Sequence, residues 1–310
     1  MPHTHDAADA IDDAVTSHTA GVRALKVSLA ILLATTVAQA VVVALSGSVA
    51  LLADTVHNLS DALTAVPLWA AFVLARRRPS ATYTYGLGRA EDVAGLVIVV
   101  AIGASAVVAA WQAIERIVDP QPVSNVGWVM TAGVVGFVGN EAVALYRIRV
   151  GRRIGSAALV ADGVHARADG ATSLAVVLGG LGVALGFPLA DPIVGLLIAA
   201  FILALLAGTV RSVGRRLLDG IDPALLSRAG HALEHVEGIT RVERVRLRWV
   251  GHRLQGDAVV TTGAATLAEA DRIRDDAERE ARAHLAHLDE FSVVVRGHPP
   301  HDAPPRGMAV

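Results

Sequence analysis

Two short segments of the sequence carry the residue types best suited to chemistry, a histidine flanked by two aspartates at one repeated spacing. Residues 54–61 and residues 162–169 both fit the pattern D-x-x-H-x-x-x-D. In a helix, the histidine and the second aspartate lie four residues apart on one face, and the first aspartate lies one turn before the histidine. The residues are Asp54, His57, Asp61, Asp162, His165 and Asp169.

The four residues that form the paired H-x-x-x-D match the preferences of a divalent transition metal. Neutral imidazole nitrogen and carboxylate oxygen are ligands of Zn²⁺, and a tetrahedral set of two of each is also accessible to Co²⁺ and Cd²⁺. The chain has no cysteine, which excludes thiolate ligands. We therefore predict a metal site made by four side chains: His57, Asp61, His165 and Asp169.

The empty site would bring together two carboxylates. Desolvation and like-charge repulsion raise carboxylate pKa values, so protons would compete with the metal for the site. This competition predicts metal/proton antiport. Three further residues are candidates for secondary ligation or proton coupling, with structural hydrogen bonding as the alternative: Asp54, Asp162 and Asn140. Glu141 is a candidate for proton coupling or gating together with Arg167; the structural alternative is that Arg167 pairs with Glu141 or reaches the lipid headgroups.

The two motifs belong to a longer internal repeat. Residues 47–64 and 155–172 are identical at ten of eighteen aligned positions. The second copy lies three predicted helices after the first, so the two motif helices run antiparallel. An inverted repeat of three plus three helices places its binding site near the middle of the membrane, between the halves.

The elements that must position these residues are membrane helices. The chain of 310 residues is 53% hydrophobic and only 18% charged, whereas a soluble protein carries about 25% charged residues. A transmembrane helix needs about 20 apolar residues. Six segments meet this requirement: 24–45, 48–75, 91–115, 126–148, 154–186 and 191–210.

Basic residues predict the orientation of these helices. They are concentrated before the first predicted helix and in the connections after the second, fourth and sixth, and basic connections stay in the cytoplasm. The set includes Arg76, Arg77, Arg78, Arg147, Arg149, Arg152, Arg153, Arg211, Arg215 and Arg216, whereas the opposite connections hold only Arg116. We expect a multi-pass protein of the cell membrane with both termini in the cytoplasm.

The remaining chain predicts a small cytoplasmic domain between two tails. Charges become frequent after about residue 214, and helical and alternating patterns follow in the order αββαβ: 222–236, 241–249, 253–261, 266–288 and 291–296. We expect a disordered tail over 1–22, a six-helix membrane domain over 23–212, a cytoplasmic α+β domain over 213–298 and a disordered tail over 299–310.

The sequence resembles the cation diffusion facilitators over roughly residues 20–298. The resemblance rests on the paired H-x-x-x-D, on Y-G-x-G-R-A-E at 85–91, on D-P at the start of the sixth helix and on the αββαβ region. It implies His57, Asp61, His165 and Asp169 as the transport site. It also implies a homodimer, a ferredoxin-like cytoplasmic domain and export of divalent metal against protons, with zinc favoured by His at the first position.

One departure concerns the cytoplasmic domain, where some relatives bind two metals through several histidines. Here the matching positions hold Glu243, Asp271, Arg296 and His298. We therefore treat Glu243, Asp271 and His298 as weak metal candidates and expect dimerisation to be the main role of this domain.

Other functions fit less well. No H-E-x-x-H motif is present to support an intramembrane metalloprotease, so we do not expect an enzyme. A membrane metal sensor or scaffold without transport remains the alternative. The net charge of −2 does not favour nucleic acid as a partner. We expect no resident cofactor; the metal is cargo, with Zn²⁺ ranked before Cd²⁺ and Co²⁺, and these before Fe²⁺ or Mn²⁺.

Overall fold

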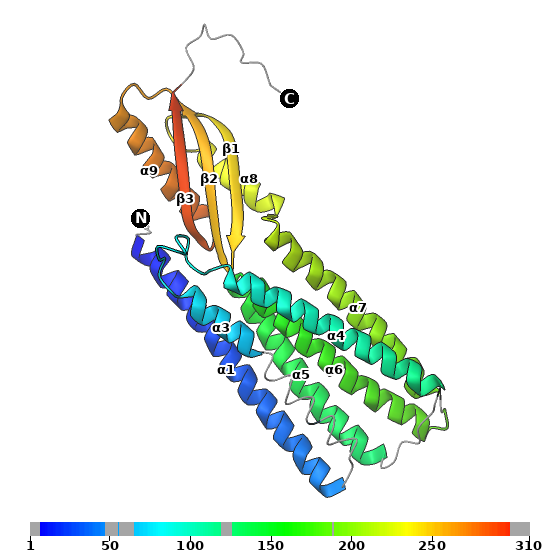
Figure 1. Cartoon of the computed structure of the whole chain (residues 1–310). Helices are drawn as coiled ribbons and strands as arrows, with labels where there is room; N and C mark the ends of the chain where they lie inside the picture. The colour runs from blue at the N-terminus through cyan, green and yellow to red at the C-terminus, as the bar shows by residue number, and fades with distance from the viewer. Residues whose placement is uncertain (1–6, 47–54, 56–64, 119–125, 188, 298–310) are drawn as a thin grey trace. The chain divides into compact units, whose positions relative to one another are not determined.

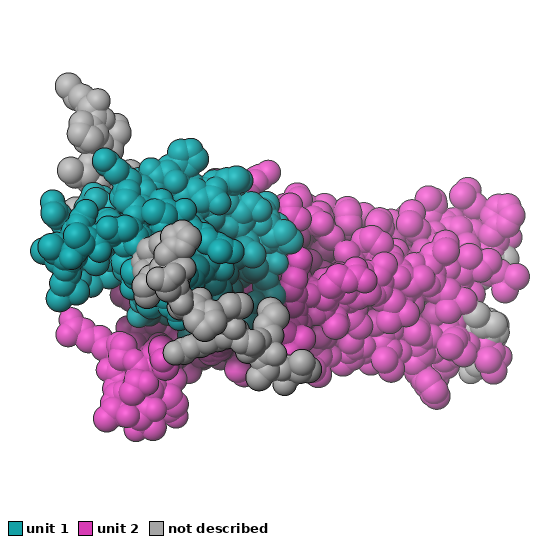
Figure 2. Space-filling model, turned by 90° about the horizontal axis from the view of Figure 1, so that it is seen from above, with its two compact units in different colours: residues 1–14, 219–310 teal, residues 15–218 magenta. Residues whose placement is uncertain are grey.

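The computed structural model describes residues 7–46, 55, 65–118, 126–187 and 189–297. Two compact units make up the chain. Residues 15–218 form one, and residues 219–310, grouped with residues 1–14, form the other (Figure 2).

The first unit is a bundle of helices (Figure 1). Four of them contain stretches long and apolar enough to cross a membrane: Thr19–Leu45, Ala90–Glu115, Gly127–Ile154 and Pro192–Leu217. These stretches coincide with the first, third, fourth and sixth predicted spans. The helices are α1 (Ala7–Ser46), α3 (Ala65–Ala75), α4 (Ala90–Val118), α5 (Val126–Ile154), α6 (Ala157–Ala184) and α7 (Ala190–Leu217).

The other two predicted spans differ from these four. Helix α6 is 28 residues long and carries Asp162, His165, Arg167 and Asp169, at about 42 Å long enough to cross a bilayer. Of the second predicted span, Ala65–Ala75 is described as an apolar helix. His57, Asp61 and Asp54 lie outside the described residues.

The predicted N-terminal tail overlaps helix α1. A disordered segment was expected over 1–22, but α1 begins at Ala7. Residues 7–15 read AADAIDDAV, and alanine has the highest intrinsic helix propensity. The acidic residues interrupt the apolar character of this segment without interrupting its helical backbone.

Glycines bring α5 and α6 into backbone contact. A Cβ atom at Gly163 would lie 3.0 Å from the amide nitrogen of Ile148 and 3.1 Å from the carbonyl oxygen of Ala144. A Cβ at Gly151 would lie 2.9 Å from the amide nitrogen of Val160. Small residues that allow such close approach are typical of helix packing in membranes.

This contact predicts a large effect for a small substitution. We expect Gly163→Ala to lower the free energy of unfolding by about 1–3 kcal/mol, because backbone atoms cannot rotate away from the added methyl group. Gly208→Ala is the matched control, since a Cβ there meets no atom within 4 Å. Thermal unfolding of both variants in detergent measures the difference. Equal stability would show that α5 and α6 can move apart enough to accommodate the added methyl group without loss of stability.

The second unit contains a three-stranded sheet with two helices. In chain order these are α8 (Pro223–Glu234), β1 (Ile239–Val250), β2 (Arg253–Thr262), α9 (Leu267–His284) and β3 (Leu288–Gly297). Strand β2 is central, antiparallel to β1 and parallel to β3. Both helices contribute to one apolar core with the sheet, including Leu233, Ala277 and Phe291. The predicted αββαβ order is confirmed.

Capping side chains begin the helices of this unit where the sequence predicts. The Asp222 carboxylate accepts a hydrogen bond from the Ala224 amide, and the Thr266 hydroxyl accepts one from Glu269. The end of α9 was predicted wrongly. The helix stops at His284 rather than at residue 288, because Leu285 is already extended (φ −115°, ψ 109°) and is buried in the core.

Candidate metal transport site

Helix α6 is fixed at its first turn by polar contacts. The Ser156 hydroxyl caps the helix by accepting a hydrogen bond from the Leu159 amide at 3.1 Å, and it donates a hydrogen bond to Glu91 of α4. Arg216 of α7 donates to the carbonyl oxygen of Gly155 at 2.8 Å. These contacts tie the start of α6 to α4 and α7, and so help to set the depth of the motif residues that follow.

His165 and Asp169 lie together on a buried face of α6. Their side chains are 4% and 6% exposed, and Nδ1 of His165 is 3.7 Å from Oδ1 of Asp169. The Asp169 carbonyl oxygen accepts a hydrogen bond from Thr172. One imidazole and one carboxylate, a helical turn apart and shielded from solvent, can supply two adjacent ligands to one metal ion.

The described residues contain only this half of the predicted four-ligand set. Within the described ranges, no group of three or more His, Asp or Glu side chains is arranged to hold a metal. His57 and Asp61, the other two predicted ligands, lie outside those ranges. The complete set therefore stays a prediction from the repeated motif.

Asp162, one turn before His165, has a fixed partner. Its Oδ2 is 2.9 Å from Nη1 of Arg147 on α5, and the two side chains are 0% and 2% exposed. Sequence reasoning missed this role of Arg147, which was placed among the basic residues of a cytoplasmic connection. The signal that could have found it is a single arginine within the fourth predicted span, facing a motif that contains one more aspartate than the metal needs.

A second ion pair joins the same two helices. Arg167 donates two hydrogen bonds to the carboxylate of Glu141, at 3.1 Å and 2.7 Å. Arg167 therefore has a partner within the bundle. Asn140, the neighbour of Glu141, is buried, and Gly170 permits close approach there, since a Cβ at Gly170 would lie 3.3 Å from Cβ of Asn140. Asn140 thus packs against Gly170, the residue that follows Asp169 in the sequence, and its secondary ligation stays a prediction.

Two of the three weak metal candidates, Glu243 and Asp271, lie in the described part of the second unit and have other partners. The Glu243 carboxylate accepts hydrogen bonds from Thr261 at 2.7 Å and from Arg296 at 3.1 Å. The Thr261 hydrogen bond, with help from the charge of Arg296, holds the pKa of Glu243 below its usual value.

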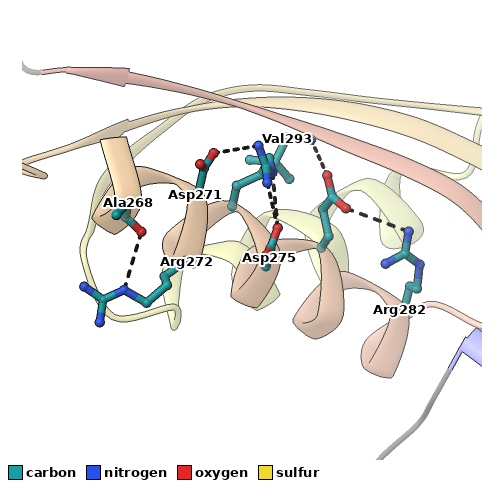
Figure 3. A network of polar contacts seen from close by, with 8 residues as sticks. Ala268, Asp271, Arg272, Asp275, Arg282 and Val293 are labelled. Atoms are coloured by element: carbon teal, nitrogen blue, oxygen red, sulfur yellow. Dashed lines mark hydrogen bonds and ion pairs between the residues drawn. The ribbon is translucent and has the colours of Figure 1, made fainter. Parts of the chain in front are cut away.

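Asp271 belongs to a different set of contacts, along helix α9. It pairs with Arg274 at 2.8 Å, and Arg274 also reaches Asp275 (Figure 3). His298, the third candidate, lies outside the described residues. These pairings favour the interpretation that Glu243 and Asp271 are structural.

Four helices long and apolar enough to cross a membrane, together with a buried His–Asp pair and a buried Arg–Asp ion pair, are typical of a multi-pass membrane protein with a polar interior site. The family description "Cation efflux transmembrane domain" matches residues 25–218. The chain belongs to this cation efflux family, whose members are transporters rather than enzymes.

Relatives support the assignment across most of the chain. The probable cation efflux system protein Rv2025c of Mycobacterium tuberculosis is 58% identical over 280 residues, covering 90% of this chain and 84% of the relative. The manganese efflux system protein MneS of Bacillus subtilis is 23% identical, covering 86% and 92%. The zinc transporter ZitB of Escherichia coli is 30% identical, covering 58% and 55%. The names of the last two show that relatives differ in their metal.

Proposed function

We propose that this protein exports Zn²⁺ from the cytoplasm in exchange for protons, through a site formed by His57, Asp61, His165 and Asp169. The observation that carries the proposal is the buried His165–Asp169 pair on α6, together with the repetition of its motif at His57 and Asp61. A single such pair could be structural. Its duplication in a second apolar segment favours a shared binding site.

The donor set accounts for both parts of the exchange. Two carboxylates balance the charge of a divalent ion, so the loaded site is nearly neutral and tolerable in an apolar bundle. When the ion leaves, the two negative charges are destabilised by burial and take up protons. Metal and protons therefore occupy the site in alternation, as antiport requires.

Histidine nitrogen favours zinc over the hard cations. Mg²⁺ and Ca²⁺ prefer shells made only of oxygen, whereas Zn²⁺ accepts nitrogen and oxygen in tetrahedral geometry. Cd²⁺ and Co²⁺ share this preference and rank next. Fe²⁺ and Mn²⁺ rank last, because they favour more ligands and more oxygen.

Orientation and assembly complete the proposal. The basic residues at the predicted connections support an orientation with both termini in the cytoplasm of a cell-membrane protein, and the proposal includes association of two copies as a homodimer. Dimerisation would then be the principal role of the cytoplasmic domain, because Glu243 is committed to Thr261 and Arg296.

Zinc flux into reconstituted vesicles tests the proposal. We expect a zinc-sensitive dye inside the vesicles to report uptake that speeds up when the interior is acidic, because outward proton movement then drives inward zinc movement. Protein-free vesicles with the same gradient are the control. Uptake that ignores the pH gradient would replace antiport by facilitated diffusion, and zinc binding without uptake would favour the sensor or scaffold.

A further inference from the structure

The ion pair between Arg147 and Asp162 is the most deeply buried charge pair among the described residues. Arg147 is the largest of the fully buried side chains, and the pair joins α5 to α6 at 2.9 Å. No described residue donates a hydrogen bond to either oxygen of Asp162, so its contact with Arg147 is an ion pair rather than a directed hydrogen bond. Within that part of the chain, Arg147 alone balances the charge of Asp162.

The pair lies close to the metal ligands of α6 without being one of them. Asp162 precedes His165 by three residues, which is about 4.5 Å along a helix axis. Both belong to the buried face that continues to Asp169. A group that fixes Asp162 therefore fixes the rotation of the helical face that carries His165 and Asp169.

In the first half of the internal repeat, the position that corresponds to Arg147 does not hold a cation. The offset that aligns Asp54 with Asp162 aligns Gln39 of α1 with Arg147 of α5. Gln39 is also fully buried, but it is neutral and donates a hydrogen bond to the carbonyl oxygen of Ala132 at 3.3 Å. The two halves thus share a buried polar side chain at this position, and only the second half has a cation there.

We infer that Arg147 and Asp162 are positioning residues, which orient the His165–Asp169 half of the site, and that Asp162 is neither a metal ligand nor a carrier of the exchanged protons. The inference rests on the proposed transport of zinc through that site. A carboxylate paired with a buried guanidinium is already charge-balanced, so it gains less from a metal than Asp169 does. The pair also holds α6 against α5 at the turn next to the ligands.

Neutralising one partner and neutralising both have different consequences under this assignment. Arg147→Gln leaves the buried Asp162 carboxylate without an opposite charge, and Asp162→Asn leaves the buried Arg147 guanidinium without one. The double variant leaves no unbalanced charge. Gln is also the residue that the first half of the repeat carries at this position.

We expect each single variant to lower zinc flux by about tenfold or more, the range seen when groups that orient metal ligands are lost. The double variant Arg147→Gln, Asp162→Asn should recover most of that flux. Its KM for zinc and the acceleration by an acidic vesicle interior should match the wild-type protein. A double variant that folds but has a raised KM would make Asp162 a ligand, and one that no longer responds to the pH gradient would make it a proton carrier.

A second variant decides the matter if the double variant cannot be purified. Asp162→Glu keeps a carboxylate that the long Arg147 side chain can follow, so zinc binding to the purified protein should stay within about threefold of wild type. If Asp162 were a ligand, moving its carboxylate by the length of one methylene group would lower the affinity by more than about tenfold. Calorimetric zinc binding also separates this inference from the proposed function. If the wild-type protein shows no zinc flux, the proposed transport is wrong. Zinc affinity equal to that of the wild type in Asp162→Glu would still exclude Asp162 as a ligand.

Discussion

Replacing Asp169 by alanine is expected to abolish zinc flux while leaving the protein folded. Asp169 is buried beside His165 on α6, and in the proposed site it supplies one of four ligands and one of two charges that balance the metal. Because groups outside the ligand shell already change metal affinity by about 10–100-fold, loss of a ligand should reduce flux by more than about 100-fold. Dye-loaded vesicles measure the flux, and circular dichroism measures folding.

Asp276→Ala is the matched control for this experiment. It removes an aspartate of the same chemistry from helix α9, where Asp276 pairs with Arg279 one turn away and both side chains are largely exposed. Exposed pairs of this kind contribute about 0–1 kcal/mol, so flux should be unchanged. Wild-type flux in Asp169→Ala would remove Asp169 from the site and with it the proposed function.

Replacing His57 by aspartate is expected to change the metal that is carried. The substitution exchanges a nitrogen ligand for a charged oxygen ligand, so the preference for Zn²⁺ over Mn²⁺ or Fe²⁺ should weaken. We expect the wild-type protein to carry Zn²⁺ best, followed by Cd²⁺ and Co²⁺. Flux measured for each ion in turn, on both proteins, gives the ratio of zinc to manganese transport.

His57→Asn separates charge from ligand type in this comparison, since Asn has the shape of Asp without its charge. We expect Asn to lower the flux of all the ions rather than to shift the ratio toward manganese. Transport of manganese but not zinc by the wild-type protein would reverse the ranking of the metals, although the assignment of the four ligands would stand.

The apolar helices and the order of the elements in the second unit could be predicted from the sequence because both depend on local patterns. Long apolar runs and alternating strands are signals of single segments, and Asp222 and Thr266 mark helix starts by their own side chains. The end of α9 could not be read in this way. The helical pattern continues through residue 288, and tertiary burial of Leu285 ends the helix earlier.

The site was predictable only where residues repeat. Because His165 and Asp169 are four residues apart, they lie on the same face of one helix, and the repeated motif adds His57 and Asp61 to the predicted site. The role of Arg147 depends on how α5 packs on α6, which the sequence of either helix alone does not contain. By its position near the end of an apolar span, Arg147 resembled the arginines of the predicted connections, yet it is buried against Asp162.

The close packing of α5 on α6 has a consequence for how the site changes during transport. Glycine contacts at Gly151 and Gly163 and two ion pairs join these helices, and His165 and Asp169 lie one turn apart on the same helix. In the proposed site, His165 and Asp169 would therefore act as a chelating pair whose two ligand atoms keep a constant separation. Under the proposed mechanism, the site opens to the other side of the membrane only when the distance between this pair and the ligands of the first half changes. The ion therefore loses two ligands together rather than one at a time.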